Sequence, residues 1–156
     1  MFGYGSLAAE QGGVPCRLRE HRRGWGVAMD NRETIPGYKV YLDPETGERP
    51  HVHVAYLSIT PHPGEHVDGC AFPVTDEELA ALDERERNYE RRDVTAQCDL
   101  DGRVWAYVGS AAGRRRLDEG RRQGTAVIAR CYLEKVRRFV PPDLPVRTLL
   151  RRDVRP

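Results

Sequence analysis

Short segments of alternating residues, separated by turn residues, dominate the first half of this chain and most constrain how it can fold. Residues 17–29, 38–42, 52–59 and 67–74 show this pattern, which is typical of strands. Turn-rich sequence closes the second strand at residues 43–47 and breaks the chain at residues 60–64. We expect a further hairpin in which residues 94–100 and 103–108 flank Asp101-Gly102, a strong two-residue turn signal.

Two helices are expected beside these strands. The first, over residues 76–87, opens with a capping box in which Thr75 accepts from a backbone N–H and Glu78 reaches back. The second runs from about residue 125 to residue 139 and is ended by Pro141-Pro142. The sequence therefore predicts an α+β fold, a small and mostly antiparallel β-barrel or rolled sheet flanked by helices.

The chain length of 156 residues corresponds to one ordinary domain. We expect that domain over residues 1–140, followed by a Pro- and Arg-rich tail over residues 141–156 with little means of burying itself. Four widely spaced cysteines form no Cys-x-x-Cys pair and are predicted to be reduced core residues.

The charge pattern argues against several classes of protein. Twenty-five basic and 24 acidic residues nearly cancel, whereas nucleic-acid modules usually carry a basic excess with interleaved aromatic residues. We therefore expect no nucleic-acid partner, although the arginine clusters keep an RNA- or protein-binding surface as a rival hypothesis.

No apolar run approaches the ~20 residues of a membrane helix. With no signal-peptide pattern either, we expect a cytoplasmic protein with no membrane partner, either a monomer or a homodimer.

Glu86 breaks the pattern of the first predicted helix. Leu79 and Leu82 define its apolar face, and Glu86 projects between them. Burying a lone carboxylate raises its pKa, which suits a general acid/base. The alternative interpretation is a structural Glu86 at the end of the helix, paired with Arg91 or Arg92.

A glycine-rich loop at the N-terminus is the second candidate feature. Gly3-Tyr4-Gly5-Ser6-Leu7 follows the short apolar start Met1-Phe2. Glycines permit close backbone approach, so that successive N–H groups can converge on an anion or a carbonyl oxygen. The loop is no dinucleotide fingerprint, because neither a third glycine nor a long helix is expected after it.

Taken together, the two features resemble the gamma-glutamylcyclotransferase and gamma-glutamylamine cyclotransferase superfamily. Its members have a Tyr-Gly-Ser loop after the first strand and a catalytic glutamate in a Leu-Asp-x-x-Glu pattern. Here that pattern is Leu82-Asp83-Glu84-Arg85-Glu86, followed by a segment from Tyr89 to Val94 that is similar to the family's Tyr-x-Arg-x-x-Val. The segments at residues 16–25 and 67–72 also resemble family strands, so the likeness covers about residues 2–139.

The resemblance implies an enzyme that cyclises a gamma-glutamyl group to 5-oxoproline and releases an amine or amino acid. Glu86 is then the catalytic acid/base, and Tyr4, Gly5, Ser6, Leu7 and Tyr89 are the substrate-binding residues. Tyr89 could orient the Glu86 carboxyl or touch the substrate, or simply belong to the core. The expected partner is a small gamma-glutamyl substrate, and no metal or organic cofactor is expected.

Three points leave alternatives open at the level of sequence. The histidines at positions 51, 53, 62 and 66 suggest zinc, but no cysteine or carboxylate cluster has ligand spacing around them. Some family members carry an aromatic substrate contact before the last helix, whereas residues 113–117 read Gly-Arg-Arg-Arg-Leu here, so the leaving-group pocket should differ. A non-catalytic small-molecule binding module on the same scaffold is the main rival function.

Overall fold

The computed structural model describes all residues, 1–156, and shows a mixed α+β fold. In chain order the elements are β1 (Phe2–Gly3), α1 (Ser6–Gln11), β2 (Val14–Asp30), β3 (Lys39–Leu42), β4 (His53–Ala71), α2 (Asp76–Arg85), β5 (Tyr89–Asp93), a 3₁₀ turn (Thr95–Gln97), β6 (Trp105–Gly109), α3 (Ala111–Gln123), β7 (Ala126–Ala129), α4 (Arg130–Val136), β8 (Val146–Arg147) and β9 (Leu150–Asp153). No helix is both long and apolar enough to span a membrane.

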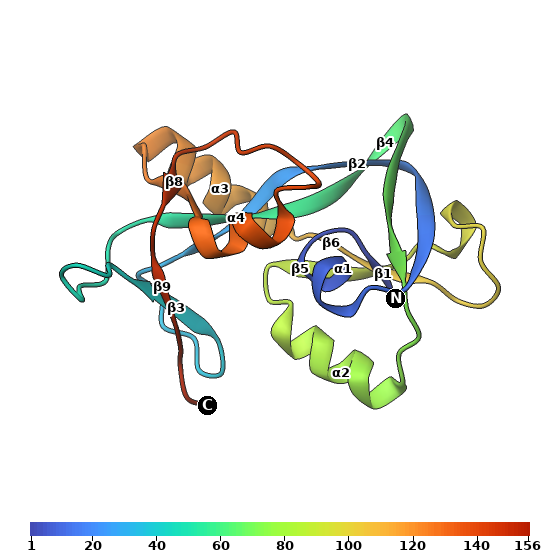
Figure 1. Cartoon of the computed structure of the whole chain (residues 1–156), viewed down its shortest axis with the longest axis horizontal. Helices are drawn as coiled ribbons and strands as arrows, with labels where there is room; N and C mark the ends of the chain where they lie inside the picture. Colours follow the sequence, from blue (N-terminus) through green and yellow to red (C-terminus); the bar gives the residue numbers. More distant parts are fainter.

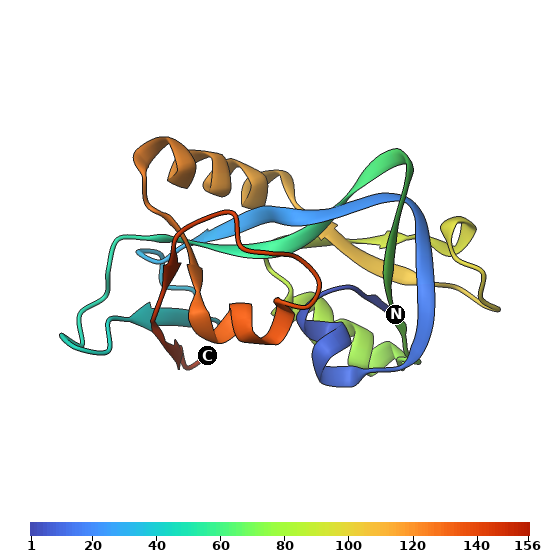
Figure 2. The same cartoon turned by 45° about the horizontal axis from the view of Figure 1, so that its top comes forward.

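A long antiparallel ribbon of β2 and β4 forms the backbone of the sheet. β1 adds to one end of β4, with Phe2 opposite Ala71, and β7 adds in parallel at the other end. The ribbon curls into a half-barrel, with α3 on one side and α1, α2 and α4 on the other (Figures 1 and 2). The predicted fold class, a mostly antiparallel rolled sheet flanked by helices, is confirmed.

The predicted strand break at residues 60–64 is wrong, because β4 continues through it. The pairing passes from Arg19 opposite His66 to His21 opposite Pro61. Residues 62–65 therefore face Glu20 alone, and Glu20 has a positive φ of 59°. The prolines and glycine of this segment mark a bulge within the ribbon, where an interruption of the ladder is tolerated.

The predicted second hairpin is also shifted. β6 pairs with β5 at Tyr89–Asp93, whereas the expected first strand, residues 94–100, is a 3₁₀ turn and loop. Gly102 does adopt the positive φ of a turn, at 85°, but within this longer connection. The turn predicted from Asp101-Gly102 is present, but the strand predicted before it is not.

The helices are more numerous than the sequence predicts. The first predicted helix is present as α2, with its capping box formed at Thr75 and Glu78. The second, over residues 125–139, is instead strand β7 followed by α4. Helices α1 and α3 are not among the predicted elements.

The spacing of apolar residues does not predict helix α3, because glycine supplies much of its buried face. Its buried residues are Gly113, Leu117 and Gly120. A Cβ atom on Gly120 would lie 2.6 Å from the His53 Cβ, so the helix and β4 approach closely only without a side chain there.

The C-terminal segment is not a loose tail. β8 pairs with β7, β9 pairs with β3, and Leu149 is 4% exposed. Most of residues 141–156 are exposed, as expected of a segment with little means of burying itself, and Leu149 is its one buried residue. Strand pairing with β3 and β7 nevertheless holds the segment in place. Their separation from a domain ending at residue 140 stays a prediction.

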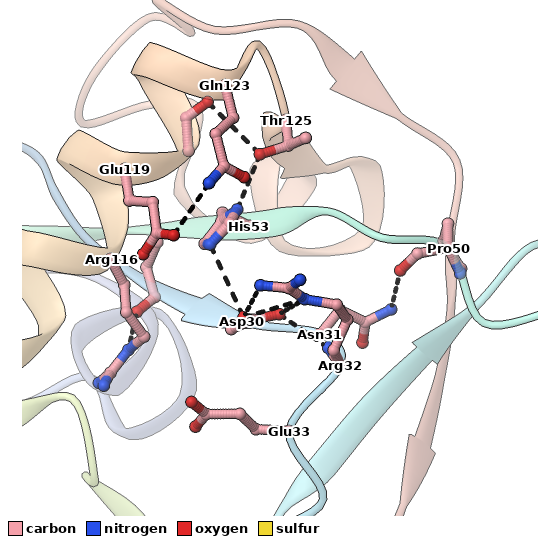
Figure 3. Close-up of polar contacts among 12 residues, drawn as sticks. Asp30, Asn31, Arg32, Glu33, Pro50, His53, Arg116, Glu119, Gln123 and Thr125 are labelled. Atoms are coloured by element: carbon pink, nitrogen blue, oxygen red, sulfur yellow. Dashed lines mark hydrogen bonds and ion pairs between the residues drawn. The ribbon is translucent and has the colours of Figure 1, made fainter.

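A buried polar cluster holds the end of β2 against its neighbours (Figure 3). The Asn31 side chain accepts from the Tyr41 N–H at 2.8 Å and donates to the carbonyls of Tyr41 and Pro50. Beside it, the fully buried His53 ring bonds to Thr125 at 2.8 Å. Asn31 thereby fixes β3, which forms one wall of the site described next.

Candidate active site

Glu86 is the cap residue at the C-terminal end of α2. Its N–H donates to the Leu82 carbonyl at 2.8 Å, and its own carbonyl accepts from the Tyr89 N–H at 3.1 Å. With φ −89° and ψ 56°, Glu86 has left the helix, which ends two residues earlier than the sequence predicts. The turn directs its side chain inward, where 14% of it is exposed.

Burial dominates the electrostatics of Glu86. It raises the pKa of the carboxyl above its usual value, while the charges of Arg85 and Lys39 oppose the shift and Glu10 adds to it. The nearest cation is the Arg85 Nε, at 3.5 Å, and Arg85 also binds Glu10 at 3.1 Å. No hydrogen bond to the Glu86 carboxyl is present.

The structural alternative for Glu86 required an ion pair with Arg91 or Arg92. Arg91 pairs instead with Asp83 at 3.1 Å, and Arg92 pairs with Glu90 at 2.6 Å. That alternative is wrong in its stated form, because both arginines lie on β5 with partners of their own.

The backbone just after Glu86 is held by residues that sequence reasoning missed. The Arg116 guanidinium on α3 donates to the Asn88 side-chain oxygen at 2.7 Å and to the Ala28 carbonyl at 2.8 Å. Asn88 in turn donates to the Tyr38 hydroxyl at 3.2 Å. Asn88 is 3% exposed, so this chain of bonds fixes the turn that carries Glu86.

The N-terminal loop runs from β1 into the first turn of α1. Gly3 lies against the start of the helix, since a Cβ there would be 2.8 Å from the Ala8 nitrogen. The N–H groups that open a helix have no intrahelical partner, and here they belong to the predicted loop residues. Together with Phe2 and Glu86, the loop from Gly3 to Leu7 lines a small recess of about 30 Å³.

A second, larger cavity of about 490 Å³ adjoins the recess. Ser6, Glu86, Tyr89 and Tyr132 line both spaces. The structure therefore brings together Glu86 and the loop of Tyr4, Gly5, Ser6 and Leu7, some eighty positions apart in the sequence. A volume of this order suits a ligand the size of a small peptide.

Tyrosines surround the site to an unusual degree. All seven tyrosines of the chain line the recess, the cavity or both: Tyr4 and Tyr107 the recess, Tyr38, Tyr41 and Tyr56 the cavity, Tyr89 and Tyr132 both. Burial raises the pKa of every one of them, so all remain protonated near neutral pH. Their clustering could not be recognised from the sequence, where they are scattered from position 4 to position 132.

Tyr89 does not orient Glu86 through a hydrogen bond. Its hydroxyl donates to the Leu57 carbonyl at 2.6 Å, while the Leu57 N–H donates to the Tyr132 hydroxyl at 3.3 Å. The two rings thus fix β4 at the floor of the site. Tyr4 is held in the same way, through a 2.6 Å bond to the Tyr107 carbonyl.

Part of the lining of the larger cavity comes from segments that the sequence reasoning did not assign to the site. β3 contributes Lys39 and Tyr41, and β9 contributes Arg151 and Asp153. Residues 113–117, considered for the leaving-group pocket, line neither space and belong to α3, which lies across the ribbon (Figure 2). The aromatic contacts of the cavity are supplied by its tyrosines instead.

The fold and site define an α+β protein with a largely buried carboxylate that lines a recess and an adjoining cavity. Residues 1–125 match the family model described as "Gamma-glutamyl cyclotransferase, AIG2-like". The chain belongs to this family. Strand β7, helix α4 and strands β8 and β9 lie beyond the matched residues.

Solved structures give weaker likenesses. One titled "Gamma-glutamyl cyclotransferase" is 16% identical, with a TM-score of 0.45, and the match covers 94% of this chain and 90% of that one. An uncharacterized protein from Homo sapiens is 17% identical, with a TM-score of 0.42 and the same coverage of both chains. No curated protein matches the sequence.

Proposed function

We propose that this protein is a gamma-glutamylcyclotransferase, which converts a gamma-glutamyl amide into 5-oxoproline and releases an amine or amino acid. The observation that carries the proposal is the buried Glu86 carboxyl, without a hydrogen-bond partner, in a recess that it shares with the glycine loop. Membership of the family supports the general class of reaction. A non-catalytic binder has little need to bury such an acid, since its desolvation is costly.

The reaction is intramolecular, so the protein has to fold the substrate and manage its protons. The α-amine attacks the side-chain carbonyl carbon, the new carbon–nitrogen bond closes the five-membered ring, and the original amide bond breaks. Two protons pass from the attacking nitrogen to the departing nitrogen. Glu86 takes up each proton and returns it. Its raised pKa lies nearer to neutral pH, where the carboxyl can both accept a proton and release one.

In this proposal one part of the substrate lies in the recess and another part lies in the larger cavity. A volume of about 30 Å³ accommodates little more than one water-sized group, such as the carbonyl oxygen of the scissile amide. Backbone N–H groups of Gly5, Ser6 and Leu7 stabilise the oxyanion that develops there, and such donors typically contribute a few kcal/mol. The released amine occupies the larger cavity.

A panel of gamma-glutamyl compounds, assayed for 5-oxoproline release, tests the proposal. The panel should contain gamma-glutamyl amino acids, gamma-glutamyl dipeptides, lysine acylated by a gamma-glutamyl group on its ε-amine, and simple gamma-glutamyl alkylamides. We expect release from at least one class without added metal or cofactor. Binding of panel members without any 5-oxoproline production would favour the non-catalytic module instead.

A further inference from the structure

Lys39 lines the larger cavity, which Glu86 lines as well. It is the first residue of β3 and stands opposite Asp153 of β9. Its ammonium lies 4.5 Å from the ring centre of Tyr56 and 5.1 Å from that of Tyr38. Lys39 lines the larger cavity but not the recess.

Lys39 is the cavity cation without an anionic partner. Arg85 and Lys135 both bind Glu10, at 3.1 and 3.3 Å, and Arg151 binds Asp153 at 2.9 Å. By contrast, no carboxylate lies within 4.0 Å of the Lys39 ammonium and no acceptor hydrogen-bonds to it. The protein itself leaves this charge unpaired.

Leaving that charge unpaired is costly. Burial lowers the pKa of Lys39 to about 8, the positive charge of Arg151 adds to the shift, and the Glu86 carboxylate opposes it. The two tyrosine rings stabilise the cation in part. An ammonium has three N–H donors, however, and aromatic faces satisfy them less well than oxygen acceptors. A carboxylate entering the cavity supplies what is missing.

We propose that Lys39 is a specificity-determining residue that binds a carboxylate carried by the leaving amine. This inference rests on the proposed function and names its substrate class, gamma-glutamyl amino acids or peptides in preference to gamma-glutamyl alkylamines. Both reacting nitrogens must lie at Glu86, beside the recess. The part of the substrate that extends from there into the larger cavity, where Lys39 lies, is then the leaving group.

The glutamyl unit also carries a carboxylate, so the test must separate the two sources. Gamma-glutamylalanine and gamma-glutamylethylamide differ only in the carboxylate of the leaving amine. Each is assayed for kcat/KM with the wild-type protein, Lys39→Met and Lys135→Met. Lys135→Met is the matched control, because it removes a cavity cation that Glu10 already neutralises.

The wild-type protein should prefer gamma-glutamylalanine. Lys39→Met should lower kcat/KM for that substrate about ten- to a hundredfold, the range for one hydrogen bond between charged groups. Because the Lys39 charge also lowers the pKa of the Glu86 carboxyl, its loss should affect turnover of both substrates to a similar extent through Glu86. The ratio of the two kcat/KM values is therefore the readout, and Lys135→Met should retain the preference. Lys39→Gln keeps a polar end without the charge. It replaces Lys39→Met in the comparison if the methionine variant does not fold.

A binding measurement keeps the inference testable if turnover is absent. Calorimetry with Glu86→Gln, alone and combined with Lys39→Met, compares the affinities of the same two compounds. Absence of 5-oxoproline from every substrate, with the Lys39-dependent difference in affinity retained, contradicts the proposed function but not the role of Lys39. An equal loss for both compounds assigns Lys39 to the glutamyl carboxylate and overturns the inference. Unchanged preference, or no difference in affinity, also overturns it.

Discussion

Glu86 combines burial with a lack of close partners, and its effect on stability should depend on pH. Folding raises its pKa, so the native state holds this proton more tightly than the unfolded state does. The destabilising effect of Glu86 is absent below the ordinary glutamate pKa and grows as the pH rises to the raised value. A tenfold difference in proton affinity between the folded and unfolded states corresponds to about 1.4 kcal/mol.

Glu86→Gln should therefore be at least as stable as the parent protein at pH 8. Its advantage should shrink as the pH falls toward 4.5, the usual glutamate value. Urea unfolding of both proteins across this range measures the difference. An early-melting Glu86→Gln at pH 8 would indicate that the carboxylate stabilises the fold after all.

The sequence indicates Glu86 and the glycine loop as candidate site residues but does not predict their surroundings. A carboxylate among leucines and a glycine-rich start are local patterns, visible without a structure. The bonds from Arg116 to Asn88 and from Asn88 to Tyr38 join α3, the turn after Glu86 and the residue before β3, and no local pattern encodes them. The same is true of Lys39, whose significance depends on the lack of a partner.

At the scale of elements, helix α3 shows why part of the fold escapes prediction. Its apolar stripe is reduced to Leu117 between two glycines, because the helix packs on β2 and β4 through close backbone approach. Helix α2 is predicted well because a capping box is a local signal. Residues 125–139 are predicted wrongly because a buried strand and a short helix follow one another without a break.

Gly120→Ala tests this close packing. The added Cβ would meet the His53 Cβ at 2.6 Å and the Ala126 Cβ at 3.2 Å. Overpacking typically costs ~1–3 kcal/mol, which should exceed the gain of about 1 kcal/mol in helix propensity. We expect a lower melting temperature in calorimetry.

Gly24→Ala is the control, because a Cβ there meets nothing within 4 Å. It should melt near the parent temperature or slightly above it. A Gly120→Ala protein more stable than the parent would mean that α3 and β4 do not approach as described.

At the scale of the whole molecule, the C-terminal segment completes both the fold and the cavity. It returns across the chain to pair with β3, and its residues lie beyond the match to the family model. Leu149→Ala should lower the free energy of unfolding by about 2–5 kcal/mol, the usual effect of truncating a buried leucine. Denaturant unfolding measures this loss.

The neighbouring Leu150 offers a matched control, since it is 54% exposed whereas Leu149 is 4% exposed. Leu150→Ala should change stability little. Equal effects of the two substitutions would indicate a loose tail, as the composition of residues 141–156 suggests.

The proposed activity also depends on the whole chain, since the recess joins β1, α1, β4, the α2 turn, β5, β6 and α4. Its most direct test is the turnover and the melting temperature of Glu86→Gln, measured on the same sample. Glutamine keeps the shape of the side chain but cannot transfer protons, a contribution usually worth ~10²- to 10⁴-fold. We predict a loss of that size in 5-oxoproline production, with folding intact. A folded Glu86→Gln protein that turns over substrate at the parent rate would contradict the assignment of Glu86.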